Sequence, residues 1–171
     1  FSEYIEGSGN NKGLEIYNPT AVAIDLTPYL VIESGNGGSF TDTLNLSGTI
    51  AAGATYMLCT DQADATMQAV ADTVLGFPSV SHFNGNDALI LWNGTDTIDV
   101  IGEVGVDPGT GSGGGWTLGT GNTIDHTLVR KIGVQSGINN WLISATQWDV
   151  YPQNTFGFFG SHTMNPCGNT N

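Results

Sequence analysis

The chain has 171 residues, 39% of them hydrophobic, so it is long enough to bury a core as one domain without metals or many disulfides. Its 16 acidic and 3 basic residues give a formal net charge of −13, which disfavours nucleic-acid binding because phosphates need several Lys or Arg contacts. Glycine is abundant, with 25 residues, and long helix-forming side chains are scarce, so the composition favours strands and turns over helices.

The first 60 residues predict short strands separated by turns. The strands are expected at 1–5, 14–17, 25–33 (after Pro28), 44–50 and after Gly53. Between the first two, GSGNNKG is a turn because Gly and Asn tolerate positive φ, and SGNGGS at 34–39 is a second flexible turn. The alternation LEIY in the second strand places Leu14 and Ile16 on one face and Glu15 and Tyr17 on the other.

The middle of the chain predicts one helix and a closing hairpin. Residues 61–74 are the single plausible helix, since Ala63, Met67 and Val70 follow helical spacing. The run ALILW and the run TIDVIGEVG then read as two strands joined by a turn at Asn93-Gly94.

The composition of the sequence changes at Asp107. The segment DPGTGSGGGWTLGTGN is rich in glycine and has no periodicity, so it predicts a long loop. The run TIDHTLVRK that follows predicts a short strand, and the remainder to Thr163 is aromatic and irregular.

Three stretches of this pattern resemble one family. They are FSEYIEGSGNNKGLEIYNP (1–19), LNLSGTIAAGATYMLC (44–59) and FNGNDALILWNGTDTIDVIG (83–102), and together they resemble the lamin tail domain family, a small immunoglobulin-like β-sandwich. Residues 107–163 are similar to the extension of its bacterial secreted branch, in which an LVRK-like strand precedes a W…WDVY…TFG..GSHT tail.

The resemblance implies an all-β fold. We expect an immunoglobulin-like β-sandwich with one short helical insert and an irregular aromatic C-terminal extension. The chain would be a single domain over 1–171, with the core sandwich at 1–105 and the Gly-rich loop and extension at 106–171.

The resemblance also implies a function class. Modules of this branch often lie beside nuclease or phosphatase domains and do not catalyse reactions themselves. We therefore expect a secreted, extracellular accessory or binding module of a bacterial protein, which positions a partner domain or mediates contacts with proteins or surfaces. The family defines no functional residue well enough to transfer to this sequence.

Acidic side chains suggest a calcium site near the Gly-rich loop. Glu103, Asp107 and Asp125 flank this loop, and Ca²⁺ favours clustered oxygen ligands that would order it. Glu3, Glu6 and Glu15 form a second acidic group at the first hairpin. No calcium-loop spacing occurs there, so solvated carboxylates on a polar strand face are the favoured interpretation.

The histidines do not predict an enzyme. His82, His126 and His162 are the three in the chain, and neighbouring Asp125 cannot orient His126 because adjacent strand residues point to opposite faces. No G-x-S-x-G, H-E-x-x-H or C-x-x-C motif occurs. Structural histidines are the favoured interpretation, and no catalytic residue is assigned.

The aromatic residues allow two interpretations. Trp92, Trp116, Trp141 and Trp148 either form a sugar-stacking surface or pack a second small core that fixes the tail onto a sheet. Packing is favoured, because turn residues separate the aromatics of the tail. Trp116, within the Gly-rich loop, is the candidate exposed ligand-binding residue, and with calcium it would define a carbohydrate-binding module. Arg130 is expected to be buried against carboxylates and to tie the tail to the sandwich.

Two further contacts are predicted. Cys59 and Cys167 fit a disulfide that would close a loop of more than a hundred residues. An immunoglobulin-like sandwich also has open sheet edges, so the chain could self-associate as a structural subunit, with residues 1–5 as a candidate donor strand. No apolar run is long enough to span a membrane.

Overall fold

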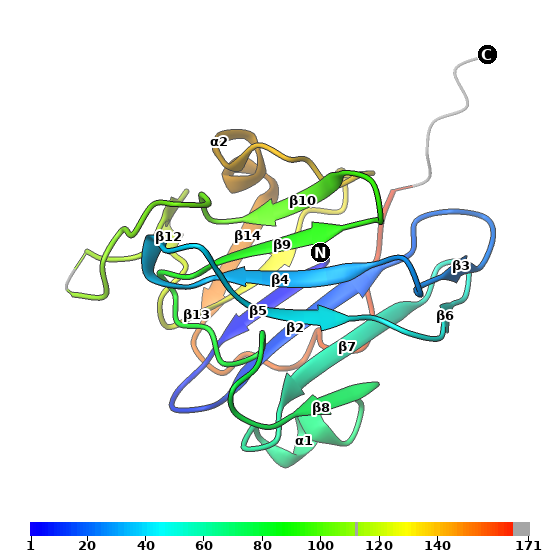
Figure 1. Cartoon of the computed structure of the whole chain (residues 1–171), viewed down its shortest axis with the longest axis horizontal. Coiled ribbons are helices and arrows are strands. Elements are labelled where there is room, and N and C mark those ends of the chain that lie inside the picture. Colours follow the sequence, from blue (N-terminus) through cyan, green and yellow to red (C-terminus); the bar gives the residue numbers. More distant parts are fainter. Residues whose placement is uncertain (112, 166–171) are drawn as a thin grey trace.

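A computed structural model describes residues 1–111 and 113–165 of the chain, which form two packed β-sheets (Figure 1). The first sheet has six strands in the order β14-β13-β1-β2-β7-β8. Their bounds are β1 (Glu3–Glu6), β2 (Lys12–Tyr17), β7 (Thr55–Thr60), β8 (Thr73–Leu75), β13 (His126–Arg130) and β14 (Trp148–Pro152).

The second sheet has four strands in the order β10-β9-β4-β5. They are β4 (Leu30–Ser34), β5 (Phe40–Asn45), β9 (Ala88–Trp92) and β10 (Thr97–Ile101), and each pairs antiparallel with its neighbours. Two small ribbons lie outside these sheets, formed by β3 (Ile24–Asp25) with β6 (Thr49–Ile50) and by β11 (Thr117–Leu118) with β12 (Gly121–Asn122).

The main core lies between the two sheets. Tyr4, Leu14 and Leu128 enter it from the six-stranded sheet, and Val31 and Leu89 enter it from the four-stranded sheet. This period-two alternation is what buries one face of each sheet. The predicted all-β, immunoglobulin-like sandwich is confirmed.

The outer face of the six-stranded sheet is also covered. Ile5 points away from the main core and packs with Met57, Cys59, Met67 and Phe159 in a second apolar cluster. Met67 belongs to α1 (Ala65–Gln68) and Phe159 to the tail, so both the helical insert and the tail lie against this face.

The helical insert is shorter than predicted. The side chain of Asp64 accepts a hydrogen bond from the Thr66 amide and caps the start of α1, but the helix ends at Gln68. Residues 73 and 74, the end of the predicted helix, instead belong to β8, which pairs parallel with β7. Strand pairing of the β-branched residues here outweighs the weak helical periodicity.

Two predicted strands are each divided in two. The segment 25–33 separates into β3 and β4 because the Asp25 carboxylate accepts hydrogen bonds from the amide and hydroxyl of Thr27, which makes a turn before Pro28. The segment 44–50 separates into the end of β5 and β6 around Gly48, whose φ is +86°.

The C-terminal extension is more regular than its sequence predicts. The predicted strand within TIDHTLVRK is confirmed as β13. Beyond it lie α2 (Trp141–Ser144), the 3₁₀ turn η2 (Ala145–Gln147) and β14. No helix in 1–111 or 113–165 is long and apolar enough to cross a membrane.

The position of β1 corrects the proposal that residues 1–5 donate a strand to a neighbour. This strand pairs with β2 on one side and with β13 on the other, so both of its backbone edges are satisfied within the chain. The prediction failed because the partner of its second edge comes from a segment more than a hundred residues away.

The acidic residues of the first hairpin are buried, which corrects their interpretation as solvated. Glu3 and Glu15 lie opposite each other in the β1–β2 register, and each side chain is only 1% exposed. The Glu15 carboxylate accepts hydrogen bonds from the Ser2 hydroxyl (2.6 Å) and the Gly160 amide (2.7 Å). The tail therefore closes over this carboxylate pair.

Glu3 has fewer hydrogen bonds than Glu15. Neither of its carboxyl oxygens has a hydrogen-bond partner among the described residues. Burial, reinforced by the neighbouring Glu15, raises the pKa of Glu3 to about 9. Glu3 therefore carries a proton at neutral pH, which removes the cost of an unpaired buried charge.

Glu3→Gln tests this assignment through the pH dependence of stability. The folded state holds the Glu3 proton more tightly than the unfolded chain, so the wild-type protein loses stability as pH rises from about 4.5 towards 9. The uncharged variant lacks this loss, and its free energy of unfolding should exceed that of the wild type by about 1–3 kcal/mol at pH 8.5 but not at pH 4.5.

Urea unfolding at several pH values measures this difference. Glu103→Gln is the matched control, because Glu103 is exposed and its substitution should leave the pH profile unchanged. Parallel pH profiles for the wild type and Glu3→Gln would show that Glu3 is not protonated in the fold.

Candidate functional site

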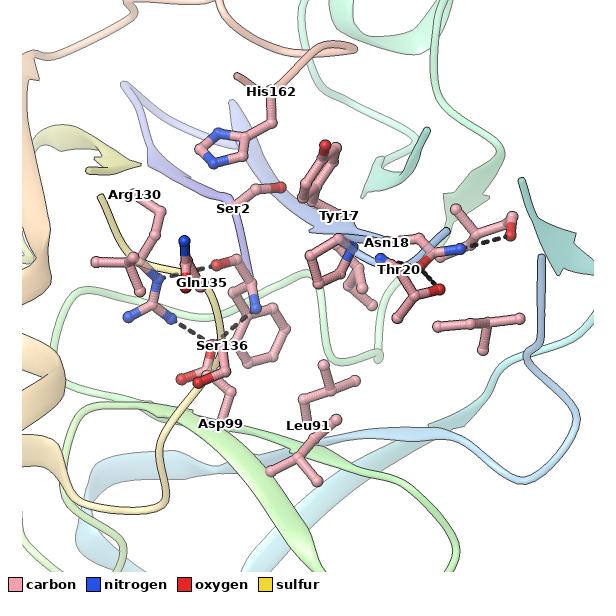
Figure 2. Close-up of a pocket in the computed structure, with 18 of the residues that line it drawn as sticks. Ser2, Tyr17, Asn18, Thr20, Leu91, Asp99, Arg130, Gln135, Ser136 and His162 are labelled. Carbon is pink, nitrogen blue, oxygen red and sulfur yellow. Dashed lines mark hydrogen bonds and ion pairs between the residues drawn. The ribbon is translucent and has the colours of Figure 1, made fainter. Parts of the chain in front are cut away.

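A pocket of about 590 Å³ lies between the two sheets, beside the β3–β6 ribbon. Its walls come from β2, β9 and β10, from the loop at 134–139 and from the tail near His162. Figure 2 shows the pocket with Asp99 and Arg130 at one end, Asn18 and Thr20 at the other, and Tyr17 and His162 together on one side.

The pocket walls are mainly apolar. Ile16 of β2 and Leu91 of β9 line the pocket from the two sheets, and Ile24, Ile50 and Ile98 extend the apolar surface. The same alternation that builds the core therefore continues into the pocket. Ligand pockets of proteins are commonly apolar hollows of this size with a few polar groups.

A buried ion cluster forms the charged end of the pocket. Asp99 of β10 accepts hydrogen bonds from the Arg130 guanidinium and, at 2.7 Å, from the amino group of Phe1. Its second oxygen accepts from the amides of Val100 and Ile138, both at 3.1 Å. Burial alone would raise the pKa of Asp99, but the Phe1 amino group and Arg130 outweigh it and hold the pKa below 3.8.

Arg130 is equally well satisfied. Its Nε donates to the Phe1 carbonyl (3.0 Å), and Nη1 donates to Ser144 Oγ (3.2 Å) and Gln147 Oε1 (2.9 Å). Its guanidinium also lies 3.9 Å from the ring centre of Trp148. The structure thus confirms that Arg130 is buried against a carboxylate and links the C-terminal extension to the sandwich.

His162 is a neutral residue at the side of the pocket. Its ring packs edge-on against Tyr17, with 5.0 Å between ring centroids and an interplanar angle of 65°. Burial, together with the positive charges of the Phe1 amino group and Arg130, lowers its pKa below 6.5. No carboxylate among the described residues hydrogen-bonds to it, so it is not arranged as a general base.

A serine–histidine contact lies outside the pocket, and it was not predicted from the sequence. Ser79 Oγ is 2.9 Å from His82 Nδ1, and Ser81 Oγ is 3.0 Å from Ser79 Oγ. These residues belong to a single turn, closed by a hydrogen bond from the His82 amide to the Ser79 carbonyl. The other ring nitrogen, His82 Nε2, is buried and has no partner in the described part of the chain, so no acidic group orients this histidine.

The structure does not bring Glu103, Asp107 and Asp125 together. Asp107 accepts hydrogen bonds from Asn86 (2.9 Å) and from the Gly109 amide (2.7 Å), while Asp125 accepts from Gln153. Glu103 is exposed. Across residues 1–111 and 113–165, no three acidic, histidine or cysteine side chains are grouped so that they could hold a metal ion.

Trp116 is a core residue, which corrects its assignment as an exposed sugar platform. Its side chain is 8% exposed, and its ring packs edge-on against Trp141 at 6.0 Å. The ring lies directly over Gly102, where an added Cβ would come within 2.6 Å of it. The Trp116 amide donates to Thr123 Oγ1 (3.0 Å), which fixes the end of the Gly-rich loop.

Trp116, Trp141 and Trp148 are packed, as the favoured interpretation predicted, but they belong to the main core and not to a second small core. The carbohydrate-binding alternative loses the side chain on which it depended. Loop composition misled the prediction, because it does not reveal that a distant glycine makes room for the ring.

Cys59 is buried in the second apolar cluster, where burial raises the pKa of its thiol to about 11. Its predicted partner, Cys167, lies outside the described residues. The disulfide between them stays a prediction.

These observations define the class of protein: an immunoglobulin-like β-sandwich with a buried, internally paired ion cluster and a mainly apolar pocket. The Lamin Tail Domain family model matches residues 1–105, which is more than half of the chain, and the chain therefore belongs to this family. Comparison with curated proteins gives no match. The family is one of non-catalytic, immunoglobulin-like modules, which makes this chain a binding or structural module.

The sequence predicted the burial of Arg130 against a carboxylate but did not predict a pocket. Neither Asp99 as the partner of Arg130 nor the loop at 134–139 as a pocket wall was predicted. Asp99 carried one signal: it is a lone acid inside the apolar strand TIDVI, where a buried charge needs a partner.

Arg130→Met tests whether the ion cluster supports the fold. Removing the guanidinium leaves Asp99 buried with fewer partners, and we expect a loss of about 3 kcal/mol in the free energy of unfolding, measured by urea denaturation. The matched control is Lys131→Met, because this exposed side chain donates a hydrogen bond to the Thr146 carbonyl and forms no ion pair with a described residue, so its loss should change stability by less than about 0.5 kcal/mol. Equal stability of the two variants would rule out a supporting role for the cluster.

Proposed function

We propose that this chain is a non-catalytic accessory module of a secreted bacterial protein, and that it holds a partner domain, a protein or a surface in place. Membership of the lamin tail domain family supports a binding or structural role. The similarity of residues 107–163 to the extension of the secreted branch supports the finer role.

The state of the charged groups in the pocket carries this proposal. Asp99 accepts four hydrogen bonds, and Arg130 donates to the Phe1 carbonyl, Ser144, Gln147 and Asp99. Groups engaged in this way support a scaffold and are not free to transfer protons to a substrate. The pocket therefore suits binding.

The charge distribution supports an extracellular setting and a partner other than nucleic acid. Two of the three cationic side chains are buried in ion pairs, Lys12 with Glu6 and Arg130 with Asp99. With a net charge of −13, the surface is strongly acidic. Such a surface keeps a protein soluble and repels phosphate backbones.

The proposal predicts that the purified chain does not turn over the substrates of its expected neighbours. Fluorogenic phosphomonoesters and phosphodiesters, and plasmid DNA with Mg²⁺, should be hydrolysed no faster than in buffer. Turnover that follows the protein through purification and is lost in His82→Ala or His162→Ala would contradict the proposal. Among the described residues, His82 is the histidine that contacts a serine and His162 is the histidine that lines the pocket, so these two variants test both.

A self-assembling structural subunit is the second candidate function, and the edge strand β5 favours it. This strand pairs only with β4, so its outer backbone groups have no strand partner within the described residues. Phe40 at its start is 59% exposed, and Thr41 and Thr43 are exposed as well. Exposed edges of this kind accept strands from neighbouring chains.

Light scattering after size-exclusion chromatography distinguishes this candidate from the first. Self-assembly predicts a dimer or larger species at a protein concentration of about 0.5 mM, which Phe40→Lys should reduce to a monomer because charged edges resist pairing. Leu142→Lys, at a site on α2 that is 78% exposed, should leave the assembly unchanged. A monomeric wild-type protein at this concentration would eliminate the second candidate.

A further inference from the structure

We infer that the pocket between the sheets binds an uncharged, mainly apolar small molecule, which lies between Ile16 and Leu91. This inference rests on the proposed binding function and adds the chemical class of the ligand. It follows from the walls, the charges and the unused hydrogen-bonding groups of the pocket.

The apolar walls and the volume of the pocket favour an apolar ligand of limited size. The volume of about 590 Å³ is within the range of pockets that hold drug-sized molecules. Apolar side chains from both sheets and from the β3–β6 ribbon line the pocket, among them Ile16, Ile24, Ile50, Leu91 and Ile98. An apolar molecule that enters removes both its own surface and these side chains from water, which is favourable by about 25 cal/mol per Å².

The topology favours a compact molecule over a peptide. Two of the wall strands pair on both sides, β2 with β1 and β7, and β9 with β10 and β4. The third, β10, pairs only with β9, but the loop at 134–139 lies against its backbone, where an added Cβ on Gly137 would come within 2.6 Å of the Ile98 carbonyl oxygen. The backbone edges of β2 and β9 are therefore closed to a peptide, and the loop covers β10 at Ile98. A peptide that entered would bury amide groups without partners, and each such group costs free energy.

The charges of the pocket exclude an ionic ligand. The carboxylate of Asp99 is neutralised by the Phe1 amino group and Arg130, and all three have their hydrogen bonds within the protein. An ion in this pocket would be desolvated against apolar walls without a free counter-charge, which is strongly unfavourable. The net charge of −13 adds repulsion for anions.

Three polar side chains could orient an uncharged ligand. The hydroxyls of Tyr17 and Ser136 and the ring of His162 line the pocket and make no hydrogen bond to another described side chain or backbone group. In Figure 2, Tyr17 and His162 lie on the same side, while Ser136 is next to Asp99. Neutral His162 and both hydroxyls can donate or accept, which matches a hydroxyl, amide or carbonyl group on the ligand.

The test uses N-phenyl-1-naphthylamine, an uncharged apolar dye that fluoresces in apolar surroundings. Titration should show saturable binding of one dye per chain with a dissociation constant in the micromolar range. The anionic dye 1-anilinonaphthalene-8-sulfonate has the same aromatic body with one sulfonate, and it should bind at least tenfold more weakly. Absence of saturable binding of the uncharged dye, or equal affinity for both dyes, would overturn the inference.

Two variants locate the dye. Ile24→Trp fills the pocket from β3 and should weaken binding at least tenfold, whereas Val22→Trp places the same side chain nearby at a site that is 67% exposed and outside the pocket, and should not. Ile98→Phe fills the pocket from β10 and replaces Ile24→Trp if circular dichroism shows that the latter does not fold. Binding that neither pocket-filling variant weakens would also overturn the inference.

These outcomes are separate from those that test the proposed function. Hydrolytic turnover by the chain would refute the non-catalytic role whatever the dye does. Missing dye binding without turnover would refute the ligand class alone.

Discussion

The buried contact between Arg130 and Asp99 is the interaction on which the rest of the structure depends. Arg130 ends β13 in the six-stranded sheet, and Asp99 lies in β10 in the four-stranded sheet. The pair therefore joins the two sheets at one end of the sandwich. It also joins the part of the chain that matches the family to the extension beyond it, since Ser144 and Gln147 bind the same guanidinium.

A buried ion pair of this kind costs desolvation and is favourable only when every donor and acceptor finds a partner. Here the requirement is met by groups far apart in the sequence, which are the amides of Val100 and Ile138, the Phe1 carbonyl and the Ser144 hydroxyl. Satisfying these groups fixes the loop at 134–139 in place, and this loop is a wall of the pocket. The ion pair thus helps to hold one wall of the pocket in place.

Local patterns predicted the strands well and long-range contacts poorly. Short runs such as ALILW and HTLVR form strands because their apolar and β-branched composition is a signal contained within a few residues. The predicted helix over 61–74 was too long, because its last residues belong to β8 and pair parallel with β7. Hydrophobic periodicity does not reveal such a pairing partner. The burial of Glu15 and Trp116 was missed for the same reason. Gly160, whose amide donates to Glu15, and Gly102, beneath the Trp116 ring, lie outside the local pattern of either residue.

Native-state hydrogen exchange tests most directly whether this ion pair makes the sandwich and the extension one cooperative unit. If it does, the slowest amides of β13 will open with the same free energy as those of β2 and β9, and this free energy will equal that of global unfolding. If the opening free energy of the β13 and β14 amides is several kcal/mol lower than that of the β2 and β9 amides, the extension is a separate, loosely attached layer.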